Sequence, residues 1–102
     1  MSVSVISLRP NISLHDTVGI IPHFLNEQDP RPAKEQFDTA YVSGWQPFHG
    51  FRRDDLTLTY PGDPPMKPLA LITFKNERIF VYQHAWVMIL EKDGTFEVAR
   101  MD

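Results

Sequence analysis

Three side chains in the last quarter of the sequence combine aromatic surface with polar tips. Tyr82, His84 and Trp86 are spaced two residues apart, so an extended strand places them on one face of a sheet. An aromatic surface with a few polar groups can line a small-molecule pocket. It can equally form a protein interface, where Tyr and Trp are enriched. A third interpretation is structural, with the N-terminal strand and the proline-rich segment covering this face.

Residues 45–55 show no clean periodicity, which predicts a loop. This loop carries the second group of candidate binding residues: Trp45, His49, Arg52 and Arg53. Arginine beside aromatic rings can hold an anion or the carboxylate of a partner. The alternative is that the arginines pair with Asp54 and Asp55 at the surface, where each pair contributes about 0–1 kcal/mol. The aromatic rings would then anchor the loop to the core.

The sequence lacks the motifs of catalysis and of metal binding. Cysteine is absent, which excludes thiolate nucleophiles and cysteine zinc sites, and the five glycines are scattered rather than gathered into a phosphate loop. No serine lies in a Gly-x-Ser-x-Gly elbow. The candidate metal ligands match no known spacing: His15, Asp16, His23, Glu27 and Asp29. We therefore predict no catalytic residue, no metal and no cofactor, and a binding protein rather than an enzyme.

Charge and hydropathy restrict the partners further. The formal net charge is −3, and the 10 basic and 13 acidic residues are interspersed. Because nucleic-acid binding needs a concentrated positive field, we expect no nucleic-acid partner. The longest apolar stretch without a charge, residues 79–90, is too short for a membrane-spanning helix. No secretion signal is evident, and the lack of cysteine suits a reducing compartment, so we expect a cytoplasmic protein with no membrane contact.

The 102 residues predict one domain covering the whole chain, 1–102, and proline divides it. All nine prolines lie between Pro10 and Pro68, so helices and loops are expected first and continuous sheet afterwards. Residues 3–8 predict a strand, and Ser13 can cap a short helix. The main helix is predicted over residues 30–43. Its apolar face is formed by Ala33, Phe37, Ala40 and Tyr41.

Strands dominate the remainder of the chain. We predict them over residues 56–60, 69–74, 79–90 and 96–101. A type II turn is expected at residues 60–63, which read Tyr-Pro-Gly-Asp, and a hairpin turn at residues 75–78. Asp93-Gly94 is the strongest hairpin pattern in the chain and predicts that Ile89 lies opposite Val98.

These turns divide the strand residues between two faces. If residues 79–90 form one long strand with a bend or bulge near residues 83–85, the aliphatic face collects Ile72, Phe74, Ile79, Val81, Val87, Ile89 and Val98. The predicted fold class is α+β: an antiparallel meander of three to five C-terminal strands, an N-terminal strand, and one amphipathic helix packed on one face.

The function predicted from this arrangement is protein interaction. We expect a small interaction module or homodimer that uses the aromatic sheet face or the loop of residues 45–55. The alternative is a small-molecule-binding protein or enzyme whose pocket is lined by Tyr82, His84 and Trp86, with His49 or Arg52 at its mouth.

Overall fold

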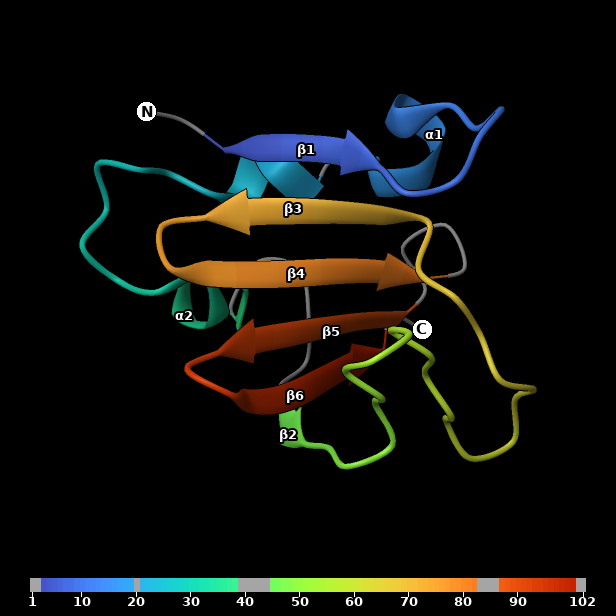
Figure 1. The fold of residues 1–102 in the computed structure, drawn as a ribbon. Coiled ribbons are helices and arrows are strands. Elements are labelled where there is room, and N and C mark those ends of the chain that lie inside the picture. The colour runs from blue at the N-terminus through green and yellow to red at the C-terminus, as the bar shows by residue number, and fades with distance from the viewer. Residues whose placement is uncertain (1–2, 20, 39–44, 83–86, 101–102) are drawn as a thin grey trace.

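A computed structural model describes residues 3–19, 21–38, 45–82 and 87–100 and shows a six-stranded antiparallel sheet in the order β1-β3-β4-β5-β6-β2 (Figure 1). The predicted C-terminal meander is confirmed. Its strands are β3 (Ala70–Phe74), β4 (Glu77–Tyr82), β5 (Val87–Lys92) and β6 (Thr95–Arg100). The predicted N-terminal strand, β1 (Ser4–Ser7), pairs with β3, and a short strand in the predicted loop, β2 (Gln46–Pro47), pairs with β6.

The turn between β5 and β6 sets the predicted register. Asp93 and Gly94 have φ of 51° and 82°, the left-handed conformation that a two-residue type I′ turn requires. Ile89 lies opposite Val98 and Glu91 opposite Phe96, as the sequence predicts.

The prediction of one bent strand over residues 79–90 is wrong. The chain reverses, and Tyr82 pairs with Val87 across a hairpin whose connection, residues 83–86, lies outside the described residues. Because of this reversal, Val81 lies opposite Met88 instead of sharing a face with Val87 and Ile89. Each β5 side chain therefore lies on the other face from the one predicted. Val87 and Ile89, and with them Val98 on β6, therefore belong to the face opposite the one predicted for them.

The turn between β3 and β4 also differs from the prediction. Its two loop residues are Lys75, with φ of 55°, and Asn76, so Phe74 pairs with Glu77 rather than with Ile79. This slip is an even number of residues, and every side chain of β3 keeps its predicted face.

Short helices cover one face of the sheet and lie behind it in Figure 1. They are α1 (Leu14–Val18), the 3₁₀ helix η1 (Ile21–Phe24) and α2 (Ala33–Asp38). Ser13 caps α1 as predicted, since its Oγ accepts the N–H of Asp16 at 3.2 Å. Helix α2 begins three residues later than predicted, and the carbonyl of Pro32 accepts the N–H groups of Glu35 and Gln36 in its first turn. The end of the predicted helix, residues 39–43 with Ala40 and Tyr41, lies outside the described residues.

The sheet is covered on both faces, so the protein has two hydrophobic cores. On the helical side, Ala33 and Phe37 are fully buried against the sheet, as their helical spacing predicts. On the opposite side, Phe51 and Leu58 pack over Phe80, Tyr82 and Ile89. A sheet buried on both faces loses the alternation of polar and apolar residues that marks a half-exposed strand.

The covering segment of residues 48–66 is held by turns rather than by regular strands. The strand predicted over residues 56–60 is wrong: Leu58 makes only isolated bridges, to Phe51 and Met66. Leu56 has φ of 62°, which interrupts an extended strand. The predicted type II turn is confirmed, since the N–H of Asp63 donates to Tyr60 at 3.0 Å and Gly62 has φ of 91°.

Candidate interaction surface

The free edge of the sheet is formed by β1, at the top of Figure 1. This strand pairs with β3 on one side, with Ile6 opposite Leu71, and within the described ranges it has no strand on its other side. An edge strand presents unpaired N–H and C=O groups that can pair with another chain.

The direction of these backbone groups follows from one hydrogen bond. The N–H of Leu8 donates to the carbonyl of Leu69 at 2.9 Å, so Leu8 faces β3. In an antiparallel pair the residues alternate between facing the partner and facing away from it. The N–H and C=O groups of Val5 and Ser7 therefore point away from β3, toward the open side of the edge.

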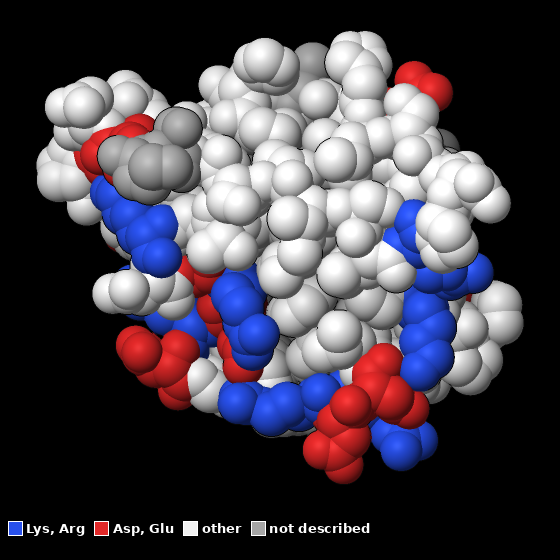
Figure 2. All heavy atoms as spheres, turned by 45° about the horizontal axis from the view of Figure 1, so that its top comes forward, with Lys and Arg blue, Asp and Glu red and all other residues white. Residues whose placement is uncertain are grey.

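The side chains of β1 leave this edge unprotected. Proteins usually guard an edge strand with charge, proline or a bulge. The sequence Ser-Val-Ile-Ser of β1 contains no charge and no proline. Ile6 is 48% exposed and is the one large hydrophobic side chain classed as exposed in the described part of the chain. Figure 2 tips this edge toward the viewer, and the centre of that view carries no Lys, Arg, Asp or Glu.

The opposite edge of the sheet is protected. Strand β2 has only two residues, and one of them is Pro47, which has no N–H to donate. The two edges therefore differ in chemistry, and β1 is the better template for strand pairing.

Strand β1 is also held firmly in place. Val3 and Val5 pack against the core on the helical side, and α1 contacts β1 and β3. The hydroxyl of Ser7 donates to the carbonyl of Arg9 at 2.6 Å, which fixes the end of the strand. A rigid edge loses little conformational entropy when it pairs with another strand.

The candidate residue Tyr82 lies in the core. Its side chain is fully buried, and its hydroxyl donates to the carbonyl of Leu56 at 2.7 Å. Burial, followed by the negative charge of Asp55, raises the pKa of Tyr82 above its ordinary value. The residues that pack with Tyr82 include Phe51 and Leu58, which precede the proline-rich segment of residues 63–68, and Met66 of that segment packs against the same cluster. The other two members of the group, His84 and Trp86, lie outside the described residues.

The candidate residues of the loop are spread over several environments. Trp45 is half-buried and stacks on Phe37, with ring centroids 6.0 Å apart. His49 is exposed. Arg52 lies near Asp55, with Nε 3.7 Å from the carboxylate, which agrees with the surface pairing considered as an alternative. These side chains do not gather around Tyr82.

Arg53 has a partner that the sequence did not indicate. Its guanidinium lies 2.7 Å from the carboxylate of Glu91, which is only 6% exposed and also contacts Arg78. The guanidinium of Arg53 also lies over the ring of Phe96, 5.3 Å from its centroid. The two arginines neutralise Glu91, and Arg53 thereby fastens the loop to β5 and β6.

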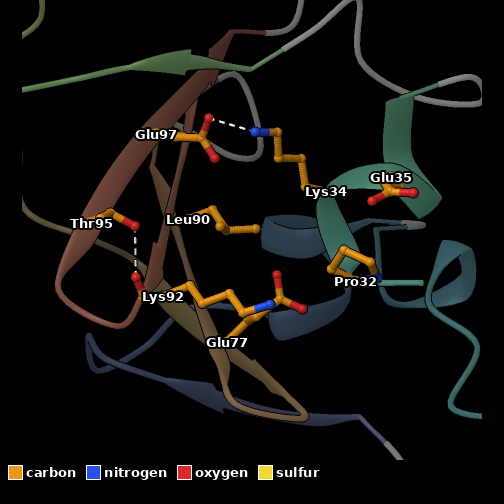
Figure 3. Close-up of a pocket in the computed structure, with 8 residues that line it drawn as sticks. All are labelled: Pro32, Lys34, Glu35, Glu77, Leu90, Lys92, Thr95 and Glu97. Carbon is orange, nitrogen blue, oxygen red and sulfur yellow. Dashed lines mark hydrogen bonds and ion pairs between the residues drawn. The ribbon is translucent and has the colours of Figure 1, made fainter. Parts of the chain in front are cut away.

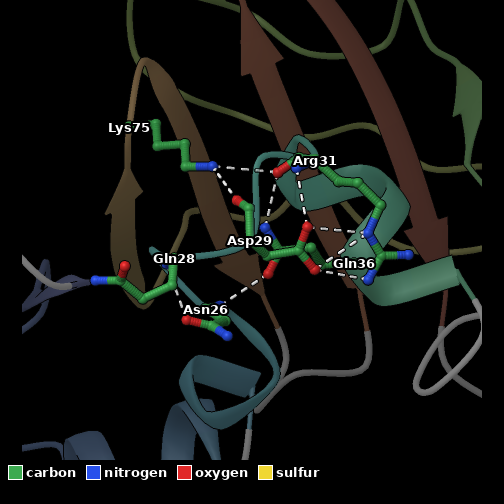
Figure 4. A network of polar contacts seen from close by, with 6 residues as sticks. All are labelled: Asn26, Gln28, Asp29, Arg31, Gln36 and Lys75. Carbon is green, nitrogen blue, oxygen red and sulfur yellow. Dashed lines mark hydrogen bonds and ion pairs between the residues drawn. The ribbon is translucent and has the colours of Figure 1, made fainter.

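A second polar network fastens the segment before α2 to the turn between β3 and β4 (Figure 4). The carboxylate of Asp29 accepts three hydrogen bonds from the guanidinium of Arg31, two from Nε at 3.1 Å and one from Nη2 at 2.7 Å. The ammonium of Lys75 donates to the carbonyl of Asp29 at 2.6 Å. The hydrogen bonds from Arg31 lower the pKa of Asp29 to about 2. Arg31 and Lys75 both donate to acceptors within the chain, which indicates a structural role.

Sequence reasoning missed two features of this molecule. The exposure of Ile6 depends on β1 being an edge strand, which its four residues do not reveal. Glu77 was assigned to a turn, yet it is buried at the start of β4 with 2% exposure. The only available signal was the absence of charge and proline from the N-terminal strand.

Comparison of the chain with protein-family models, with curated proteins and with solved structures finds no match. Among the described residues, no helix is long and apolar enough to cross a membrane. The functional argument accordingly starts from the edge strand β1 and its exposed side chain.

Proposed function

We propose that this protein is an interaction module whose partner is a second copy of the same chain, paired edge to edge through β1. The observation that carries the proposal is the exposed Ile6 on an edge strand with no charge and no proline. Natural proteins seldom leave such an edge open, because it recruits further strands.

The exposure of Ile6 favours the symmetric register that places this side chain at the centre of the pairing. A two-fold axis perpendicular to the sheet keeps the helices of both copies on the same side. In this register the outward-facing residues Val5 and Ser7 form the hydrogen-bonded pairs, Val5 of one copy with Ser7 of the other. Ile6 lies on the axis, opposite Ile6 of the second copy, at the close spacing of about 4.5 Å between Cα atoms.

The energetic terms of this contact nearly balance. Two such pairs give four main-chain hydrogen bonds, each with a net value of about 0.5–1.5 kcal/mol. Covering two half-exposed Ile6 side chains adds about 1.5–3 kcal/mol. Association costs about 4–15 kcal/mol in lost translational and rotational freedom. We therefore expect a reversible dimer that forms at high protein concentration.

The test measures mass in solution by sedimentation velocity from about 10 μM to about 1 mM, a range that spans weak dissociation constants. The native protein should rise from 11.8 kDa toward twice that mass. Ile6→Lys places two ammonium groups across the axis and should remain monomeric, because like charges directly opposite each other are destabilising.

Thr73→Lys is the matched control. Thr73 is exposed on the same face as Ile6 but lies one strand inward, on β3. The added charge is identical, and this variant should dimerise like the native protein. A native protein that stays monomeric up to about 1 mM, or an Ile6→Lys variant that dimerises normally, would refute the proposal.

A further inference from the structure

A pocket lies where the end of β1 meets the segment that covers the sheet. It has a volume of about 390 Å³ and is lined by Leu8, Arg9, Asp55, Leu56, Lys67 and Pro68. These residues come from three parts of the chain: the residues after β1, the covering segment, and the residues that lead into β3. The volume falls near the lower end of the range of small-molecule pockets, so a small organic compound fits.

Hydrogen bonds hold two walls of this pocket in place. The carbonyl of Arg9 accepts a hydrogen bond from the hydroxyl of Ser7 at 2.6 Å, which fixes the backbone after β1. The carbonyl of Leu56 accepts one from the hydroxyl of the buried Tyr82 at 2.7 Å, which ties the covering segment to β4. A preformed pocket of this kind loses little conformational entropy when a ligand binds.

Two cations of the lining keep donors that a ligand can reach. The side chain of Arg9 is exposed, and its guanidinium forms no ion pair and no hydrogen bond with the described residues. The side chain of Lys67 is 52% exposed. Its ammonium has three N–H donors and uses one of them in a hydrogen bond to the carbonyl of Asp55 at 3.1 Å.

The lining also contains the carboxylate of Asp55, which is already compensated. It accepts the N–H of Thr57 at 3.1 Å. Two cations flank it, with Nε of Arg52 at 3.7 Å and Nζ of Lys67 at 3.6 Å from its oxygens. The two cationic side chains and the single carboxylate of the lining leave one positive charge in excess. The pocket therefore favours an anion over a cation.

Apolar surface lies beside these charges. Leu8 and Leu56 are half-buried, so part of each side chain remains accessible. The planar guanidinium of arginine matches the geometry of a carboxylate, which can accept two parallel N–H donors. We propose that this pocket binds a small organic carboxylate held by Arg9 and Lys67. The alkyl chain of that ligand packs on Leu8 and Leu56.

A second pocket, of about 250 Å³ beside α2, provides a comparison (Figure 3). Its carboxylate Glu77 is only 2% exposed, and its Glu97 is paired with Lys34 at 2.7 Å. Its Lys92 is exposed, as Arg9 is, and ends β5. Lys92 therefore serves as a matched cation outside the pocket at the end of β1.

The first test uses the native protein and three probes of one chain length. Isotope-labelled protein is titrated at low concentration with butyrate, n-butanol and n-butylammonium, and the methyl resonances of Leu8 and Leu56 are followed by NMR. Saturable shifts with butyrate alone are expected, with a dissociation constant on the order of millimolar because the probe is small. No saturable shift with butyrate, or equal shifts with butanol or butylammonium, would overturn the proposal, whatever the oligomeric state.

The second test removes one charge from the pocket. Arg9→Gln should fold normally, because the guanidinium of Arg9 has no polar partner among the described residues. Binding of butyrate should weaken by about three- to tenfold, as expected for loss of a charge-assisted hydrogen bond at an exposed site. Lys92→Gln removes the same charge at the end of β5 away from Tyr82 and should change binding by less than about twofold. Equal binding by the native protein and a folded Arg9→Gln variant, or equal weakening by the two variants, would also overturn the proposal.

Discussion

Replacing Leu58 by alanine tests whether the segment of residues 48–66 is part of the core. Leu58 is fully buried among Phe51, Phe80 and Tyr82. Its backbone should survive the change, because its N–H and C=O exchange hydrogen bonds with Met66 at 2.8 and 2.9 Å. The loss is therefore one of packing and of apolar burial.

The expected loss of unfolding free energy depends on how deeply Leu58 is buried and on how far residues 48–66 can move to fill the cavity. Leu→Ala changes in protein cores cost about 2–5 kcal/mol, and the cost is lower where the surroundings can collapse into the cavity. Because residues 48–66 contain few regular strands, we expect about 2–3 kcal/mol for Leu58→Ala. For a chain of this size the melting temperature should fall by about 10–20 °C.

The assay is chemical and thermal unfolding followed by circular dichroism, at low protein concentration. Ile6→Ala is the control, because the side chain of Ile6 is 48% exposed and its loss should change stability by less than about 0.5 kcal/mol. If Leu58→Ala were as stable as the native protein, the covering segment would not be packed on the sheet. The face that carries Phe80 and Tyr82 would then be open, and the case for the aromatic face as a binding surface would return.

Three further substitutions test individual contacts. Tyr82→Phe should lower stability by about 1 kcal/mol at neutral pH, because the hydrogen bond to Leu56 is lost. The native protein should also lose stability above about pH 10, because the pKa of Tyr82 is raised in the folded state, and the variant should lack this loss. Melting temperature measured against pH tests both results. Asp29→Asn should lower the melting temperature at pH 7 but not near pH 2. Hydrogen bonds from Arg31 lower the pKa of Asp29 to about 2, so the stabilisation by its carboxylate is lost as the pH falls from about 4 toward that value. Gly50→Ala should cost about 1–3 kcal/mol in urea unfolding, since the added Cβ would lie 2.4 Å from the carbonyl oxygen of Thr59.

Each of these predictions has an outcome that contradicts it. A Tyr82→Phe variant with the same alkaline profile as the native protein would mean that the hydroxyl is not buried. An Asp29→Asn variant whose deficit persists at pH 2 would show that the carboxylate charge is not the source of its stabilisation. A fully stable Gly50→Ala variant would mean that the chain near Gly50 does not approach Thr59 as closely as the structure shows.

Local chemistry made part of the fold predictable. Asp93-Gly94 adopts positive φ at both residues, and this conformation fixes the register of β5 and β6 without help from the rest of the chain. The spacing of Ala33 and Phe37 likewise identified the buried face of α2. In both cases the information lies within a few consecutive residues.

The hairpin between β4 and β5 was not predictable in this way. The residues between Tyr82 and Val87 contain no glycine, asparagine or proline that would predict a turn. Both strands are apolar on both faces, because the sheet is covered on both sides, so an apolar run of this length also fits one long strand.

The candidate sites depended on tertiary structure even more strongly. Tyr82 was singled out as a binding residue for its chemistry, but its hydroxyl donates a hydrogen bond to the carbonyl of Leu56, which is distant in the sequence, and the side chain lies in the core. Glu77 was placed in a turn, and only the approach of α2 turns it into a buried carboxylate beside a pocket. The exposure of Ile6 follows from the strand order, which local sequence does not encode.

The most direct test of the proposed dimer uses a single thiol on its axis. The chain contains no cysteine, so Ile6→Cys introduces one reactive group per copy. In the proposed register the two thiols face each other at a Cα separation that a disulfide can bridge, whereas Ser4→Cys on the same face places them roughly 13 Å apart. We predict rapid oxidation of Ile6→Cys to a covalent dimer and slow oxidation of Ser4→Cys. Equal rates for the two variants, or a faster reaction of Ser4→Cys, would contradict pairing of two copies through β1.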